Sequence, residues 1–442
     1  MPARTVRLVG EGLSRGVPVA SPEAAAVFRI LFTALTLGYL LLDPARLPEQ
    51  PPPDASYASA VVRWLTANPG VADHLGTILI VTALAVIAGA ATRVAFAAFV
   101  AAFLAWACLR TTDSSHHPIS AFAVLMIALL PARWADAWSL DAWIRRRLGR
   151  DTPPLPSRRY GFALWLPGLV IGVTFAAAAW SKVASGPEWI LNGTIRYHFV
   201  TDLHQALVTW GPWLTSLPGV AMAGSFAAVA VEALLIGAAF LRGWRLRALA
   251  GAAALSLLAG FALFQGVIWW LWWLLLLGFV PWHLFVKRPR TLHADQGIGL
   301  AQAAAVIFVL VQQIVITTRH VEARPLFSTY DMYSTTYADA QQYEAKSNLV
   351  YRVVGVTAGG TRVPLEDCQM SDAEAVALAP APGQAPLDSL GMDIVRSCLE
   401  GRPDVAAVVL EGDRRVYDWD AGGFSWKRAL DTRGPLDVAT LN

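Results

Sequence analysis

The sequence predicts an all-α polytopic membrane bundle of about nine transmembrane helices, followed by a small α+β domain on the exoplasmic side. Hydrophobic residues make up 55% of the 442-residue chain and charged residues 15%, against about 25% charged residues in an ordinary globular domain. A single soluble core cannot hide so much apolar surface at this length. Many of the 18 tryptophans lie at the ends of apolar runs, as in the aromatic belts of membrane proteins.

Nine apolar runs predict the spans, because a helix needs about 20 apolar residues to cross a bilayer. These runs cover residues 24–42, 75–91, 93–109, 119–132, 160–182, 219–241, 247–265, 267–286 and 299–317. The fourth run is short and also fits a half-span or a helix buried in protein. The chain divides accordingly into a cytoplasmic N-terminus (1–20), a transmembrane domain (21–318) and an exoplasmic domain (319–442).

Basic residues orient the spans. One set of alternate segments carries seventeen lysines and arginines, and the other set carries five. The basic set comprises residues 1–20, 93, 133–159, 242–247 and 287–290. By the positive-inside rule, the N-terminus is cytoplasmic and everything after Thr318 is periplasmic or extracellular, in a multi-pass protein of the inner (cytoplasmic) membrane. The basic, Pro-rich linker 132–159 is expected to lie along the anionic inner leaflet. A net charge of only +3 indicates no nucleic-acid partner.

The polar tail shows strand and turn patterns. Residues 350–356 predict a strand that ends in a turn at Gly359-Gly360, and residues 405–410 and 415–417 predict a strand pair around Gly412-Asp413. Residues 372–378 and 386–400 are expected to be helical, as is an interfacial segment at 57–65. In an exoplasmic compartment Cys368 and Cys398 can form a disulfide. No CxxC-type metal-ligand spacing is present.

Lys182 is the first candidate for chemistry, because ionisable groups within or beside spans are costly and mark functional sites. It ends the fifth apolar run. Burial lowers the pKa of a lysine, and a neutral amine near working pH is a competent general base. The alternative is a lysine that snorkels to the headgroup level, although exoplasmic helix ends disfavour lysine.

His116 and His117 lie in the loop before the fourth run, on the same predicted face as Lys182. Paired histidines can shuttle protons or bind metal, and they can equally be inert loop residues. Glu232 lies in the middle of the sixth run, where a carboxylate must be protonated, paired or facing a polar cavity. Helix–helix hydrogen bonding explains it as well as function does.

Gln265 marks a break between two runs, and the tryptophan-rich segment that begins at Trp269 follows it. Such a wall suits a flat aromatic or isoprenoid ligand, although an interfacial belt accounts for it too. No Walker-type loop, GxSxG elbow or HExxH motif is present.

The stretch Trp180-Ser181-Lys182, with Trp189 and Gly193 after it, resembles a segment of the vitamin K-dependent γ-carboxylase family, which includes the bacterial horizontally transferred transmembrane domain (HTTM) proteins. The first run, with Arg29, the block from Arg93 to Pro131, and Glu232 agree with that family in order. The resemblance covers roughly residues 20–290.

The resemblance implies an integral-membrane enzyme that couples oxidation of reduced vitamin K or menaquinol, with O2 and CO2, to carboxylation of a peptide. Lys182 is then the base that deprotonates the quinol, and His116 or His117 assists. Glu232, Gln265, Trp269 and Trp189 are expected to line the cofactor site. The tail of about 120 residues departs from the large luminal region of the animal enzymes, so the substrate is open. The alternatives are a non-enzymatic scaffold or export partner that binds a peptide or protein through the tail and, less favoured, a transporter.

Overall fold

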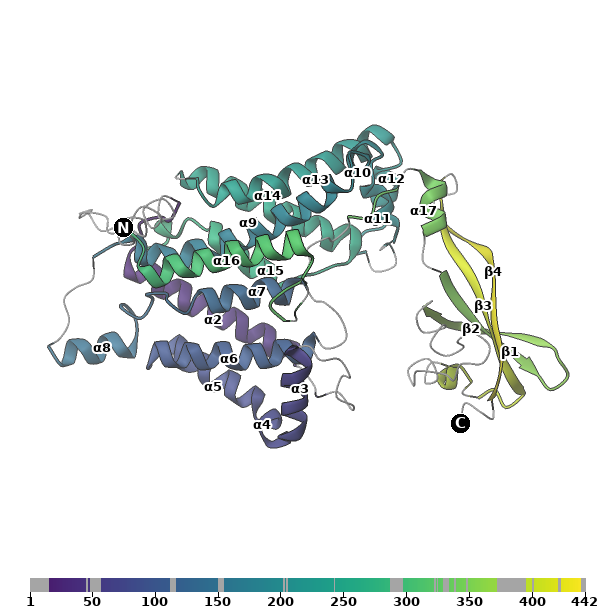
Figure 1. Cartoon of the computed structure of the whole chain (residues 1–442), viewed down its shortest axis with the longest axis horizontal. Coiled ribbons are helices and arrows are strands. Elements are labelled where there is room, and N and C mark those ends of the chain that lie inside the picture. The colour runs from purple at the N-terminus through teal and green to yellow at the C-terminus, as the bar shows by residue number, and fades with distance from the viewer. Residues whose placement is uncertain are drawn as a thin grey trace. The chain divides into compact units, whose positions relative to one another are not determined.

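A computed structural model describes residues 16–44, 47, 57–111, 117–149, 155–201, 203, 206–241, 243–286, 297–321, 323, 325–328, 334–337, 339–346, 349–371, 395–399, 401–419 and 423–438. They fall into two compact units (Figure 1). The first comprises Met1–Trp189, Gln205–Leu207 and Gly224–Thr335; the second comprises Ile190–His204, Val208–Ala223 and Thr336–Asn442.

The first unit is a bundle of apolar helices. Among the described residues, six helices are long and apolar enough to cross a membrane. They are α2 (Pro22–Leu42), α6 (Thr92–Arg110), α9 (Arg158–Ala184), α13 (Pro218–Ala238), α14 (Trp244–Gln265) and α16 (Leu300–Arg319). Each coincides with one of the predicted runs, so the membrane-bundle prediction is confirmed at this level.

The other three predicted runs form shorter helices. They are α5 (Leu75–Ala88), α7 (His117–Ala128) and a broken segment made of α15 (Trp270–Leu275), η1 (Leu276–Phe279) and η2 (Trp282–Leu284). The 12 residues of α7 extend about 18 Å, against a hydrocarbon core of about 30 Å. Pro281 follows η1, and its missing N–H ends regular hydrogen bonding there.

Local chemistry places the helix ends. Ser21 caps α2 by accepting a hydrogen bond from the Ala24 amide, and Pro22 occupies the first turn, where its missing N–H costs nothing. Helix α5 ends at Gly89 with φ +69°, and a Cβ there would lie 2.2 Å from the Cβ of Ser139. Only glycine satisfies both the left-handed backbone and that approach.

The α5–α6 turn is pinned by α8 (Leu140–Arg147). The Asp141 carboxylate accepts hydrogen bonds from the amides of Ala91 and Thr92 and from the Thr92 hydroxyl, each at 2.8 Å. These bonds satisfy amides that the first turn of α6 leaves unpaired. The predicted interfacial segment is also helical, as α3 (Tyr57–Ala67), and α4 (Pro69–Asp73) follows it.

Arg29 ties α2 to its neighbours from inside the bundle. Its side chain is fully buried and donates to the carbonyl oxygens of Trp134 at 2.7 Å, Trp138 at 2.6 Å and Ile87 at 3.4 Å. A planar guanidinium can serve several acceptors at once, which suits it to otherwise unpaired carbonyls. Arg29 is therefore a structural tie between three segments.

Helix α9 is the central element of this unit. Most of its length is buried, and it packs against α2, α7, α16 and η1. Backbone contacts are close at Gly278, where a Cβ would lie 2.1 Å from the Gly168 nitrogen, and at Gly172, where one would lie 2.9 Å from the Leu235 oxygen of α13. Small residues thus let other segments approach α9.

The second unit contains a four-stranded antiparallel sheet of order β2-β1-β3-β4. Its strands are β1 (Leu349–Thr357), β2 (Arg362–Ser371), β3 (Val405–Asp418) and β4 (Gly423–Asp437). Tyr351, Val353, Val408 and Leu410 form its small core. The predicted strand 350–356 and the following turn are confirmed, with Gly360 at φ +82°, and Cys368 and Cys398 form a disulfide.

The predicted strand pair around Gly412-Asp413 is wrong, because β3 continues through both residues, with a register irregularity against β4 between Glu411 and Asp413. Gly412 pairs with Tyr351, and Asp413 pairs with Val350 and Arg428. The Asp413 carboxylate, although buried, lies 2.5 Å from the Arg352 Nε, so an ion pair lets a turn-type residue stay in the strand. Of the predicted tail helices, 395–399 is helical, whereas 372–378 and the rest of 386–400 lie outside the described residues.

Short helices complete the second unit: α11 (Ile195–Thr201), α12 (Gly211–Leu214) and α17 (Ala340–Lys346), while α10 (Glu188–Leu191) begins in the first unit. The Tyr197 ring is fully buried and stacks on Tyr343 with centroids 5.1 Å apart. Tyr337 lies at the same distance from it, and Trp419 at 6.0 Å. This aromatic cluster joins α11 to the end of the sheet.

Candidate functional site

Lys182 and Glu232 form a buried pair between α9 and α13. The Lys182 Nζ lies 2.9 Å from both carboxylate oxygens of Glu232. The two side chains are 3% and 2% exposed, so the pair is shielded from solvent. Both helices are candidate spans. Burying a pair of opposite charges in such surroundings costs much solvation energy, which their mutual attraction offsets only when the geometry is good.

The packing of the two helices explains how residues 50 positions apart meet. Gly172 brings the backbones of α9 and α13 together below Lys182. A side chain leaves a helix pointing toward its N-terminus, so Lys182 reaches back along α9 to the level of Glu232. Much of α13 is exposed in the bundle, yet Glu232 is only 1% exposed. The carboxylate therefore faces α9.

Trp189 covers the lysine. Helix α9 ends at Ser185, and Gly186 with φ +114° turns the chain back. The Glu188 carboxylate occupies the place where a Cβ on Gly186 would lie. The turn puts the Trp189 ring 5.4 Å from the Lys182 Nζ, as a cation–π contact. Trp189 is itself 2% exposed, so the lysine is closed off on this side by an aromatic ring.

An aromatic wall lines α9 two helical turns before Lys182. Phe175 contacts the buried Trp272 with centroids 5.2 Å apart, Trp272 contacts Trp269 at 4.7 Å, and Trp269 contacts Phe261 at 5.1 Å. Since Phe175 and Lys182 are separated by two turns, they share a face of α9, about 10 Å apart. The wall therefore begins below the lysine and crosses to α14 and α15.

Gln265 ends α14, one turn after Phe261. It is 2% exposed, and its Oε1 has no hydrogen-bond partner among the described residues. Thr174, next to Phe175, also has a buried hydroxyl without a partner in the described part of the chain. Buried acceptors are rarely left unpaired, so each of these two oxygens marks a position where a hydrogen-bond donor is missing among the described residues.

His117 begins α7, and its Nδ1 lies 2.7 Å from the Ser328 hydroxyl. Its described contact is thus separate from the one that holds Lys182. His116 lies outside the described residues. The structure therefore brings together Lys182, Glu232 and Trp189. Trp269 belongs to the aromatic wall, and Gln265 lies one helical turn after Phe261 of that wall.

Trp272, Phe175 and Gly172 were not singled out by the sequence analysis. Trp272 lies in the tryptophan-rich segment that begins at Trp269. Its position in the helical repeat of α15 separates this buried ring from the exposed ring of Trp270. Phe175 and Gly172 carry no distinguishing signal within an apolar helix. Only the contact between helices identifies them.

Comparison of the chain with models of protein families, with curated proteins and with solved structures found no match.

Proposed function

We propose that the chain is an integral-membrane enzyme in which the Lys182–Glu232 pair performs acid–base chemistry on a reduced quinone. The overall reaction is carboxylation, or a related modification, of a peptide, as in the γ-carboxylase family that the sequence resembles. One observation carries the proposal: the amine and the carboxylate are paired at 2.9 Å in a dry environment, next to an aromatic wall. Structural pairing alone does not require that wall.

The pair can act as a base through internal proton transfer. Passing one ammonium proton to Glu232 leaves a neutral amine and a carboxylic acid, and apolar burial disfavours two charges relative to this neutral form. The Lys182 amine then accepts a proton from a hydroxyl placed beside it. Glu232 holds the displaced proton, and release of that proton to a basic product or to solvent restores the ammonium–carboxylate pair. Lys182 is the base in this scheme and Glu232 its proton partner.

The residues present fit a reduced quinone. Flat rings stack on aromatic side chains. Trp269 is partly exposed and can offer its face, and the fully buried Trp272 and Phe175 support it from within the wall. The Gln265 Oε1, which no described group pairs, can accept a hydrogen bond from a quinol hydroxyl. By resemblance, menaquinol or vitamin K hydroquinone supplies the reducing equivalents, O2 the oxidant and CO2 the added carbon.

Access to the pair requires movement of the segment that covers it. Lys182 and Trp189 are 3% and 2% exposed, so no substrate reaches the amine while the ring lies over it. Gly186 has the backbone freedom that such a hinge needs. Displacement of the Trp189 ring by a substrate ring would exchange one aromatic contact for another.

The topology extends this proposal. We place nine membrane-embedded segments in the inner membrane, with the N-terminus cytoplasmic and the sheet of the second unit exoplasmic, where it meets a peptide or protein substrate. The asymmetry of basic segments supports this orientation. The Cys368–Cys398 disulfide supports it independently, since such bonds persist in oxidising compartments.

The test is quinone turnover. Purified protein in detergent receives menaquinol and oxygen, and the quinone epoxide is measured. Wild type should form epoxide, and Lys182→Ala should lower the rate about 100-fold or more, which is the usual contribution of a positioned base. The control is Trp180→Phe, which alters an exposed ring two residues away. Absence of epoxide from wild type, or full activity of Lys182→Ala, would overturn the proposal.

A second function is a scaffold that binds a peptide or protein through its exoplasmic domain. The observation that favours it is the separate core and disulfide of the second unit. In that case Lys182→Ala retains function in the cell, whereas substitutions on the sheet abolish it.

A further inference from the structure

A pocket of about 550 Å³ lies at the opposite end of α9 from Lys182. Arg158 in the first turn of α9 lines it, whereas Lys182 is in the last turn of this 27-residue helix, which is about 40 Å long. Neither Lys182, Glu232 nor the aromatic wall lines the pocket. It is therefore separate from the candidate catalytic site.

Three helices begin at this pocket. Its lining includes Ser21 and Ala24 from the start of α2, Arg158 from the start of α9, and Trp244 from the start of α14. The N-terminus of a helix carries a partial positive charge and unpaired amides. Ser21 caps α2, whereas the side chain of Ser157 makes no capping hydrogen bond to α9, and α14 begins after a glycine.

The side chains add to this positive field. Arg158, Arg247 and His283 line the pocket, and none of the lining residues is an Asp or a Glu. Arg247 donates through Nη2 to the Gly278 carbonyl at 2.8 Å. Its Nε–H is buried and has no partner among the described residues. A buried donor without a partner costs stability, and the Arg247 guanidinium brings a permanent positive charge to the lining of the pocket.

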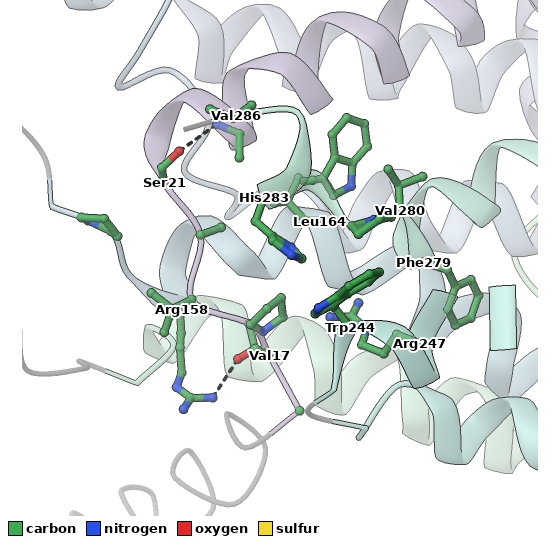
Figure 2. A pocket seen from close by; sticks show the side chains of 18 of the residues that line it. Val17, Ser21, Arg158, Leu164, Trp244, Arg247, Phe279, Val280, His283 and Val286 are labelled. Atoms are coloured by element: carbon green, nitrogen blue, oxygen red, sulfur yellow. Dashed lines mark hydrogen bonds between the residues drawn. The ribbon is translucent and has the colours of Figure 1, made fainter. Parts of the chain in front are cut away.

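The rest of the lining is apolar and aromatic. Figure 2 shows Trp244 and His283 facing each other, with Arg247 beside Trp244, and the ring centroids of the first two are 5.6 Å apart. Arg158 donates a hydrogen bond to the Val17 carbonyl at 2.7 Å (Figure 2). This bond fixes the segment around Val17, which forms one wall of the pocket. Leu164, Phe279 and Val280 also line the pocket. The pocket thus combines a part lined by basic side chains with an apolar part.

We propose that this pocket binds the phosphate-bearing headgroup of an anionic phospholipid, with the acyl chains leaving along the apolar residues. Because α9 and α14 are candidate spans, their first turns lie at headgroup depth, where tryptophan and arginine are favoured. The volume suits a glycerophosphate headgroup, since small-ligand sites measure about 300–1,000 Å³. Free phosphate shares the recognised chemistry, but it makes no use of the apolar lining.

The experiment measures lipid binding to the full-length protein in a neutral detergent by native mass spectrometry and thermal unfolding. Phosphatidylglycerol should bind with one-to-one stoichiometry and raise the unfolding midpoint, and phosphatidylcholine should do neither. Arg247→Gln should weaken phosphatidylglycerol binding about tenfold, the loss expected for one charged hydrogen bond. The matched control is Arg245→Gln, two residues away and outside the lining, which should leave binding within about twofold.

Arg247 also holds the Gly278 carbonyl, so a second variant guards against misfolding. His283→Glu puts a negative charge into the pocket and should weaken phosphatidylglycerol binding while raising no affinity for phosphatidylcholine. Equal binding of the two lipids, or equal affinities of the Arg247 and Arg245 variants, would overturn the proposal. Stabilisation by inorganic phosphate alone, equal to that by phosphatidylglycerol, would overturn the lipid as the source of the anion.

Discussion

The Lys182 ammonium lies 2.9 Å from each carboxylate oxygen of Glu232, and both side chains are closed off from solvent. The two residues come from different candidate spans, α9 and α13, and meet because Gly172 lets the helices approach. Trp189 closes the remaining side of the lysine. This ion pair can serve as a structural link between the two helices and as a store for a proton. Single and double substitutions of the pair distinguish the two roles.

Removing one partner should destabilise the protein more than removing both. Lys182→Met leaves a buried carboxylate without compensation, which costs about 3–5 kcal/mol, whereas the double variant Lys182→Met/Glu232→Met should be close to neutral. The measurement is the free energy of unfolding in detergent micelles, with Trp180→Phe as control. If the costs of the two single substitutions simply add in the double variant, the residues do not depend on each other.

Trp189→Ala should expose the lysine without removing the pair. We expect the acetylation rate of Lys182 by a water-soluble amine reagent to rise at least about tenfold, equivalent to about 1.4 kcal/mol of protection. Peptide mass spectrometry measures the rate, and Trp180→Ala, whose ring is already exposed, serves as the control. Equal labelling of Lys182 in the two variants would show that Trp189 does not protect the amine.

Arg29→Lys should destabilise the bundle nearly as much as Arg29→Met, by about 2–4 kcal/mol. A lysine retains the charge, but a single ammonium cannot reach the carbonyls of Trp134, Trp138 and Ile87 together. Thermal unfolding of the purified variants is the measurement. Arg93→Met, which removes an exposed arginine, should change the midpoint little, and a wild-type midpoint for Arg29→Lys would contradict this role.

Asp141→Ala should cost about 1 kcal/mol at neutral pH, because it removes the cap of α6. Burial by itself would raise the pKa of Asp141, but hydrogen bonds from Thr92 and Ala91 and the charge of Arg145 outweigh it and lower that pKa. A lowered folded-state pKa means that the stabilisation is present above the unfolded value of about 3.9. It is lost as pH falls through the folded value.

The difference in unfolding midpoint between wild type and Asp141→Ala should therefore be constant from pH 7 to about pH 5 and shrink below about pH 4. Asp73→Ala, at the end of α4, is the control at another surface carboxylate. A difference that stays constant down to pH 3 would contradict the assigned role of the Asp141 charge.

Reduction of the Cys368–Cys398 bond should destabilise the second unit by about 3–4 kcal/mol, as expected for opening a loop with a sequence separation of 30. Proteolysis of the full chain with and without reductant measures this, and cleavage within the strands should increase only with reductant. Cys108→Ala is the control, since Cys108 is a buried free thiol in the bundle. Increased cleavage confined to the bundle would contradict the prediction.

Local sequence patterns predicted the helices well where a long apolar run was uninterrupted. Apolar runs long enough to cross a bilayer became α2, α6, α9, α13, α14 and α16, because helix formation and lipid exposure depend on neighbouring residues. The same reasoning failed at Gly412-Asp413, where turn-type residues stay in β3. Pairing with β1 and β4 and the ion pair to Arg352 decide that position, and none of these partners is local.

The sequence by itself determined that this chain is built of apolar helices with a small sheet, and that Lys182 and Glu232 are unusual within those helices. Hydrophobicity and the cost of burying charge act on each segment separately, so they can be read along the chain. Only the tertiary structure decided that the two residues are partners, that Trp189 covers them, and that Arg29 ties three segments together. Those contacts depend on glycines that let helices far apart in sequence approach closely. The order of residues along the chain does not show which helix surfaces meet.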